Sequence, residues 1–523
     1  MKVHRVFLLP ALALLIACAG NPPPVASIPA PAVAAAVSEP VPPLAPAPAD
    51  WPTATPEEVG LDSKDLADLL ESIQTQGDPV DSVLIARDGR LVLDAYFYPF
   101  QAGMRHELRS CTKSVTSMLV GIAIGEGLLP GVERPVVEFF PERSLSNLDE
   151  RKRALRLEDL LTMSSGLDWE EQTIPYWMQA NSFSRMVQSP DPVQFFLDAP
   201  MSVDPGTRFS YNTGNSHLLS AILQRATGGS ALDFARSRLF GPLAISDVSW
   251  AADAQGVSFG GALLQMTPRD LAKLGELYRN GGVWEGKRIV PEAWVRDSIQ
   301  PRVRVSENLR YGYQWWLQPS GGYAARGYGG QLLWVLPELR MVIVMTGTSK
   351  DSWLPVMLAE LFILPAVKGE GPLPESPEAR ARLEATIRKV ARPQLRPVPP
   401  LPRIAHRITG KTYTVDDNGF GLKSFSVSFG DGEATLEVHR LEGSMKLPIG
   451  LDNVFRITDL AGIGTAAERG TWVDDRTFQL NGRFLGDSSR SELRLTFEED
   501  RVEVTAKGLD SGYLETFQGR MAR

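Results

Sequence analysis

The chain has 523 residues, of which 43% are hydrophobic, and this is typical of a globular protein with two or three domains. Its formal net charge is −8, so the chain lacks the excess of positive charge with which proteins bind nucleic acid. We therefore expect no DNA or RNA partner.

The first residues predict an export signal. A basic start precedes the apolar run VFLLPALALLIA, which is too short for a spanning helix with stable flanks. The run ends in LIAC, which resembles a bacterial lipobox, where cleavage precedes the cysteine and the thiol receives diacylglycerol. We therefore expect residues 1–18 to be a lipoprotein signal peptide and Cys18 to anchor a periplasmic protein to a membrane. Ala19 is not the aspartate associated with inner-membrane retention, which favours the outer membrane; a plain secretory signal is the alternative.

Residues 19–50 consist almost entirely of Pro, Ala and Val with little charge. Such a composition favours extended, semi-rigid conformations, so this segment is interpreted as a tether.

Residues 51–367 form a predicted α/β domain of the α+β type. Asp88 and Gly89 separate two apolar runs and indicate a hairpin near the start, and a second pair of strands turns near Pro337. Between them, Thr267 followed by a proline and an acid is typical of a helix start. Strands at both ends with helices between them predict one antiparallel sheet with a helical subdomain beside it.

The remaining chain divides into a linker and a β-rich domain. Residues 368–403 contain a charged helical segment and a proline-rich stretch. Residues 404–523 show short alternating strands at even spacing and no helix signal, which predicts an accessory barrel or sandwich.

Ser110 and Lys113 stand one helical turn apart at the head of an apolar helix, LRSCTKSVTSMLVGIAIGEGLL. A serine hydroxyl needs a base within hydrogen-bond reach, and a lysine serves only when its amine is unprotonated, a state that burial favours. The first turn of a helix also favours a developing oxyanion. The alternative is an N-cap serine with a surface lysine, because an SxxK pattern alone is common.

Cys111 and Tyr211 are two further residues to consider. Cys111 adjoins the serine but faces away from the Ser110 and Lys113 side, so we expect a packed small residue. Tyr211 lies where a Pro-Gly turn leads into an apolar helix, and it is able to relay protons if a nearby cation lowers its pKa. Taken alone, a tyrosine packed on the core is the simpler interpretation.

Several segments together resemble the penicillin-recognising serine hydrolases, in the branch of class C β-lactamases, family VIII esterases and 6-aminohexanoate-dimer hydrolases. The matching segments, in order, are WPTATPEEVGLD, the Ser110 helix, LEDLLTMSSGLDW, PGTRFSYNTGNSHLLSAIL, MTPRDLAKLGELYRNGG and ARGYGGQLLWVLPEL. The resemblance implies a β-lactamase/transpeptidase-like fold, with Ser110 as the nucleophile and Lys113 and Tyr211 as general base and acid.

The sequence departs from the family at two motifs. Thr213 stands where the family usually has Asn, a change associated with the aminohexanoate-hydrolase branch. The third motif, usually Lys-Thr-Gly or His-x-Gly, reads Tyr328, Gly329, Gly330, so the cation that grips a β-lactam carboxylate is missing there. Arg326 is a substitute or a solvated surface residue. By resemblance, the backbone N–H groups of Ser110 and Gln331 form the oxyanion hole.

The sequence therefore predicts a serine hydrolase that forms an acyl-enzyme with a small-molecule or peptide substrate, without a cofactor or metal. The scissile bond stays open among ester, linear amide, D-amino-acid peptide and β-lactam, and Tyr176 is a candidate for lining the pocket. A non-catalytic envelope protein that binds peptidoglycan peptides or a protein partner is the alternative from another class. A GxSxG match at residues 256–260 lacks the strand and helix that a nucleophile elbow requires.

Overall fold

The computed structural model describes residues 51–440, 443–460 and 464–522. The expected signal peptide, tether and lipidated Cys18 lie outside these residues. Within them, no helix combines the length and the apolar character needed to cross a bilayer.

An eight-stranded antiparallel sheet organises the first part of the chain. Asp88 and Gly89 form the predicted hairpin turn, and both have positive φ angles, which glycine and aspartate tolerate well. In chain order the strands are β1 (Val80–Arg87), β2 (Arg90–Tyr96), β8 (Val303–Arg304), β9 (Arg310–Tyr311), β10 (Trp316–Leu317), β11 (Tyr323–Gly327), β12 (Gln331–Leu336) and β13 (Met341–Gly347). Their order across the sheet is β2-β1-β13-β12-β11-β10-β9-β8, which confirms the predicted antiparallel sheet built from both ends of the domain.

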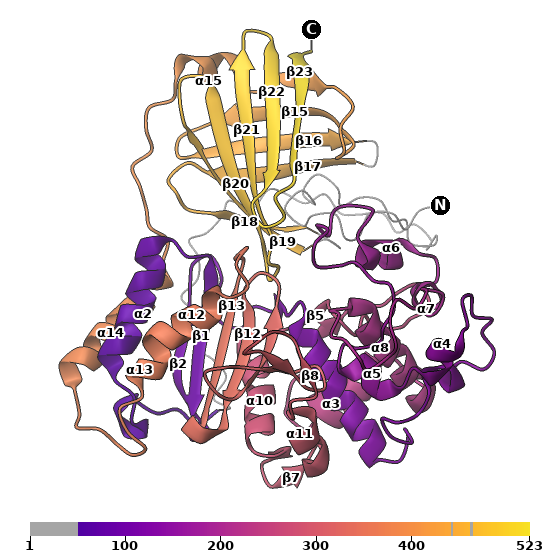
Figure 1. Cartoon of the computed structure of the whole chain (residues 1–523). Helices are drawn as coiled ribbons and strands as arrows, with labels where there is room; N and C mark the ends of the chain where they lie inside the picture. The colour runs from indigo at the N-terminus through magenta and orange to yellow at the C-terminus, as the bar shows by residue number, and fades with distance from the viewer. Residues whose placement is uncertain (1–50, 441–442, 461–463, 523) are drawn as a thin grey trace, which may run out of the picture.

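Helices cover both faces of this sheet, as Figure 1 shows. On β1, Leu84 and Ala86 belong to one hydrophobic core, whereas Val83 and Ile85 belong to the other. One face packs against α2 (Ser63–Gln76), α12 (Leu354–Leu358), α13 (Leu364–Ala366) and α14 (Pro377–Val390). The other face packs against α3 (Cys111–Gly125) and α10 (Pro268–Arg279), and α10 begins at the predicted Thr267 cap.

The helical subdomain extends from α3. Its other helices are α4 (Glu150–Ala154), α5 (Leu157–Leu161), α6 (Ser182–Gln188), α7 (Pro192–Leu197), α8 (Thr213–Thr227), α9 (Ala231–Ala235) and α11 (Glu292–Ser298). Small ribbons accompany them: β3 (His106–Glu107), β4 (Ser249–Trp250), β5 (Leu264–Met266), β6 (Val283–Trp284) and β7 (Lys287–Arg288). Close packing fixes α3, because a Cβ on Gly121 would lie 2.2 Å from the Trp294 ring of α11.

The C-terminal part is a closed β-barrel, which resolves the predicted choice between barrel and sandwich. Its strands are β14 (Thr412–Val415), β15 (Leu422–Phe429), β16 (Glu433–Arg440), β17 (Gly443–Gly450), β18 (Arg456–Leu460), β19 (Gly464–Trp472), β20 (Thr477–Leu485), β21 (Arg490–Glu498), β22 (Arg501–Gly508) and β23 (Leu514–Met521). Pairing of β17 with β19 closes the ring and leaves β18 attached outside it. In Figure 1 the barrel sits above the sheet and its helices.

One expectation for this domain is wrong. No helix was predicted within residues 404–523, yet α15 (Arg403–Ile408) begins the domain. Pro402 precedes its first residue, and Ile408 is buried in the core of the barrel, so tertiary packing stabilises a helix that its short sequence does not signal.

Candidate active site

Ser110 is the N-cap residue of α3. The residue before it, Arg109, has a φ of 49°, a left-handed conformation that is uncommon for a residue with a side chain. Such strain persists only where the surroundings hold it, and it often occurs at functional sites. The Ser110 N–H donates to no backbone carbonyl in the part of the chain that the structure describes.

Lys113 points its amine at Ser110. Lys113 Nζ lies 2.9 Å from Ser110 Oγ and 2.9 Å from the Gly261 carbonyl oxygen, and the side chain is 1% exposed. Burial lowers the pKa of Lys113 to about 8, although the charge of Glu171 opposes this shift. The structure therefore brings the two predicted residues together and makes the lysine a stronger candidate for a base than a solvated lysine.

Tyr211 completes this group from the segment before α8. Lys113 Nζ lies 4.9 Å from the centroid of its ring, and the ring stacks on Trp316 with centroids 6.1 Å apart. Burial and the charge of Glu171 raise the pKa of Tyr211, and a hydrogen bond with Ser110 offsets only part of this increase. The sequence made a lowered tyrosine pKa the condition for proton transfer by Tyr211, and the structure raises this pKa instead, so the phenol keeps its proton and is not a candidate for the base.

Thr213, the first residue of α8, binds a carboxylate that the sequence analysis missed. Glu171 is 2% exposed, and its oxygens accept hydrogen bonds from the Thr213 N–H (2.7 Å) and the Thr213 hydroxyl. Trp169 Nε1 (2.8 Å) and the Tyr176 hydroxyl (3.1 Å) also donate to it. These four hydrogen bonds replace the water molecules that the carboxylate loses when it is buried.

These residues open into one cavity of about 620 Å³. Aromatic side chains form much of its wall, and Tyr176 lies there as the sequence predicted. The lining residues include Ser110, Glu171, Tyr176, Trp177, Phe183, Tyr211, Thr213, Gly261, Trp316, Arg326, Gly327, Tyr328, Trp353, Asp510 and Ser511. Two of them, Asp510 and Ser511, belong to the C-terminal barrel, so both domains contribute to the cavity.

The third motif is arranged differently from the expectation. Tyr328 lines the cavity, whereas Gly330 and Gln331 are absent from its lining. Gln331 begins β12 and is buried; its side-chain amide donates to the carbonyl oxygens of Gly347 (2.8 Å) and Tyr328 (3.2 Å). Because Gln331 does not line the cavity, the geometry does not favour its backbone N–H as an oxyanion donor.

Gly327 allows β11 to approach the segment that carries Ser110. A Cβ on Gly327 would lie 2.6 Å from the Leu108 carbonyl oxygen and 3.1 Å from Arg109 Cβ, so a side chain would force β11 away from α3. The next residue, Tyr328, has an N–H that, like that of Ser110, donates to no backbone carbonyl of the described chain.

Arg326 supplies a cation on the cavity wall. Its guanidinium carbon lies 3.5 Å from the centroid of the Trp353 ring, and it donates to the Ser352 carbonyl oxygen at 3.3 Å. No acid lies within ion-pair distance among the described residues, its Nε has no partner, and burial lowers its pKa to about 10. Arg326 is therefore half-buried in the cavity wall rather than fully exposed on the surface.

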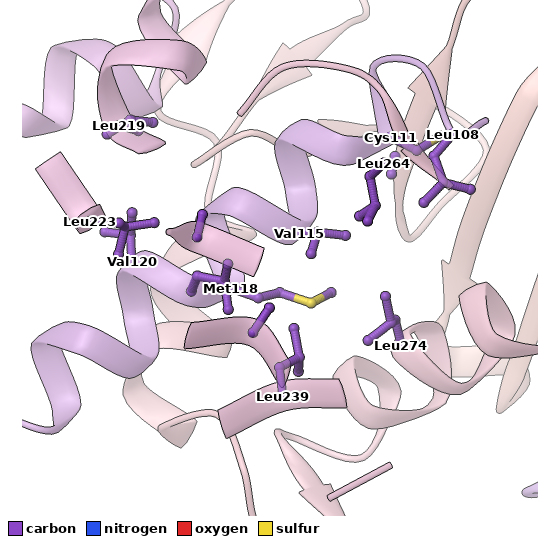
Figure 2. Close-up of a cluster of buried hydrophobic side chains, with 14 of the residues drawn as sticks. Leu108, Cys111, Val115, Met118, Val120, Leu219, Leu223, Leu239, Leu264 and Leu274 are labelled. Carbon is purple, nitrogen blue, oxygen red and sulfur yellow. The ribbon is translucent and has the colours of Figure 1, made fainter. Parts of the chain in front are cut away.

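Two other candidates do not reach the cavity. Cys111 is fully buried in the apolar cluster of Figure 2, and burial raises the pKa of its thiol to about 12, which fits the expected packed residue. Ser258 of the GxSxG match is also buried, and its hydroxyl lies 3.4 Å from the Leu232 N–H.

Comparison with known proteins agrees with this geometry. A family model described as Beta-lactamase matches residues 66–361. The 6-aminohexanoate-dimer hydrolase of Paenarthrobacter ureafaciens is 28% identical over 325 residues, covering 57% of this chain and 80% of that protein. The lovastatin esterase of Penicillium rubens is 26% identical over 189 residues, covering 34% of this chain and 46% of the esterase.

A solved structure shares the fold. It is a Bacillus anthracis protein provisionally named a 6-aminohexanoate-dimer hydrolase, with a TM-score of 0.51 and 21% identity, covering 61% of this chain and 87% of that one. Because the family model spans more than half of the sequence, the chain belongs to the beta-lactamase family of hydrolytic enzymes.

Proposed function

We propose that the protein is a serine acyl hydrolase in which Ser110 is the nucleophile, Lys113 the general base and Tyr211 the proton relay. The observation that carries this proposal is the 2.9 Å approach of a buried lysine amine to the serine hydroxyl. No carboxylate lies within ion-pair distance of this amine among the described residues, and the more distant charge of Glu171 offsets only part of the cost of burying the charged form. A non-catalytic binding protein has no need for such an amine.

The reaction follows from these positions. As Ser110 Oγ bonds to the carbonyl carbon, its proton passes to Lys113 Nζ and the carbonyl electron pair moves onto oxygen. The tetrahedral intermediate collapses when the leaving group departs with that proton, delivered through the Tyr211 hydroxyl. Water then attacks the acyl-enzyme by the same route in reverse, releasing the acid and restoring Ser110.

The backbone N–H groups of Ser110 and Tyr328 are the donors we assign to the oxyanion. Neither is used by a backbone carbonyl, both residues line the cavity, and Gly327 lets their two segments approach closely. This assignment replaces Gln331 with Tyr328, the residue that follows β11.

The cavity supports a substrate with an apolar body and an acidic group. Its aromatic wall suits the apolar body, and Arg326 is a half-buried cation with no acidic partner among the described residues. The named activities of the relatives concern an amide dimer and an ester, so we propose hydrolysis of a small linear amide or ester. An anionic group beside Arg326 would gain a charge-assisted hydrogen bond.

We also propose that the chain is a lipoprotein of the bacterial cell envelope, anchored through Cys18 and most simply placed at the outer membrane. The LIAC segment after the apolar run supports this proposal.

The nucleophile is tested by Ser110→Ala. We expect hydrolysis of p-nitrophenyl esters to fall by about 10³-fold or more, because the acyl-enzyme can no longer form. Covalent labelling by a fluorophosphonate, measured by intact-protein mass spectrometry, should also disappear. Ser258→Ala is the matched control and should keep both activities; labelling that survives in Ser110→Ala would refute the assignment.

The base is tested by the dependence of kcat/KM on pH. Lys113 acts only when neutral, so kcat/KM for a neutral ester should rise about tenfold per pH unit below the pKa and level off above about 8. At pH 7 only about one tenth of the enzyme carries the neutral amine. Lys113→Ala should abolish the rise along with most of the activity. A profile that is flat from pH 6 to 9 would contradict this role.

The acidic group is tested by Arg326→Ala. Because a hydrogen bond to a charged group contributes about 1.5–3 kcal/mol, kcat/KM for a substrate carrying a carboxylate should fall by about 10-fold to 150-fold. A neutral ester of equal length is the control substrate and should be affected less than about threefold. Equal losses on both substrates would show that Arg326 does not select an anion.

The lipid anchor is tested by labelling cells with an alkyne analogue of palmitate. The full chain should incorporate the label and sediment with membranes, whereas Cys18→Ala should do neither, because it lacks the thiol that receives the lipid. Incorporation that is unchanged in Cys18→Ala would rule out this anchor.

A further inference from the structure

The turn between β20 and β21 of the barrel contacts the segment that leads into the nucleophile. The Glu107 N–H donates to the Gly486 carbonyl oxygen at 2.7 Å, and a Cβ on Gly486 would lie 2.4 Å from the Arg105 carbonyl oxygen. Ser488 and Ser489 of this turn are fully buried. The two domains therefore touch backbone to backbone within a few residues of Ser110.

This turn holds the side chain of Arg109, the residue in the left-handed conformation. One guanidinium nitrogen lies 2.7 Å from Asp487 Oδ1, and Nε donates to Ser488 Oγ at 2.8 Å. Glu107 completes the group, 3.1 Å from Arg109 Nε. Because the peptide between Arg109 and Ser110 carries the Ser110 N–H, anchoring Arg109 fixes the direction of that N–H.

The barrel also holds the other proposed donor. The Tyr328 hydroxyl donates to the Asp510 carbonyl oxygen at 2.6 Å, and a Cβ on Gly329 would lie 2.5 Å from Ser488 Cβ. The strand end that carries the Tyr328 N–H is therefore fixed by the same barrel surface that fixes Arg109.

We propose that the C-terminal barrel is a positioning element that sets both donors of the oxyanion hole, with Asp487 and Ser488 as positioning residues. This inference rests on the proposed serine mechanism and adds a role for the domain that contains none of its reacting groups. Preorganised donors contribute to catalysis only when their geometry is held before the reaction starts.

The interface offers a matched control away from these donors. The Tyr98 hydroxyl accepts a hydrogen bond from the Phe455 N–H at 3.0 Å, and Tyr98 does not line the cavity. The same hydroxyl donates to the Phe455 carbonyl oxygen at 3.3 Å, so Tyr98→Phe removes two hydrogen bonds between the domains without touching Arg109 or Tyr328.

The experiment compares full-length variants with a neutral p-nitrophenyl ester. Asp487→Ala should lower kcat about 10-fold to 100-fold with KM within twofold, because oxyanion donors act on charge that develops in the transition state. Asp487→Asn keeps an acceptor and should lose less. Ser488→Ala and Tyr328→Phe are milder variants that replace Asp487→Ala in the comparison if that variant unfolds. Each should lower kcat about threefold or more. Tyr98→Phe should leave kcat unchanged.

A second measurement separates positioning from general destabilisation. The bimolecular rate of fluorophosphonate labelling should fall in parallel with kcat in Asp487→Ala, while the final stoichiometry stays at one label per chain, since the phosphonyl oxygen uses the same donors. Thermal unfolding should show both Asp487→Ala and Tyr98→Phe folded at the assay temperature.

Unchanged kcat in folded Asp487→Ala, Ser488→Ala and Tyr328→Phe would overturn the inference, as would a loss confined to KM or an equal loss of kcat in Tyr98→Phe. These outcomes leave the serine mechanism intact as long as Ser110→Ala is inactive. If Ser110→Ala remains active, the proposed function itself fails.

Discussion

The removal of one ammonium group from water governs the chemistry of this site. Lys113 is buried on α3 with the Ser110 hydroxyl and the Gly261 carbonyl oxygen as its hydrogen-bond partners, so its proton is held less tightly than in solvent. A carboxylate beside the amine would reverse this effect. The nearby Glu171 carboxylate is held by four other donors and does not pair with the amine, so its charge raises the pKa of Lys113 less than burial lowers it. In the proposed mechanism, the apolar packing of α3 therefore serves the base as well as the fold.

Local sequence signals were sufficient for several parts of the molecule. The Asp88 turn, the Thr267 helix cap and the spacing of Ser110 and Lys113 each depend on residues a few positions apart, and the structure has all three. The fold class followed because the signals for strands and helices agreed with one another along the chain. The closed barrel was one of two predicted arrangements, since even strand spacing does not determine whether a sheet closes.

Features that depend on tertiary contacts were not predictable. Strands β17 and β19 carry weak sequence signals, because Pro448 interrupts one and the other is rich in Gly, Ala and Thr, so pairing with neighbours makes them strands. In the sequence, Glu171 is only an acid in an aromatic stretch. Its hydrogen-bond donors come from α8 and from the side chains of Trp169 and Tyr176 on either side of it, and only the fold brings them together. The choice of Tyr328 over Gln331 depends on where β11 ends, and element boundaries are the least certain part of a sequence interpretation.

The cavity wall has a consequence for the order in which this enzyme is made. Ser110 and Asp510 are separated by 400 residues of chain, yet both face the same space. Chains emerge from the ribosome N-terminus first, at about 5–20 residues per second, so the nucleophile exists for about 20–80 seconds before the last wall of its cavity is synthesised. During that interval the growing polypeptide carries the reactive serine without the complete enclosure around it. The complete cavity therefore forms only after the last part of the barrel has been synthesised and has packed against the first domain.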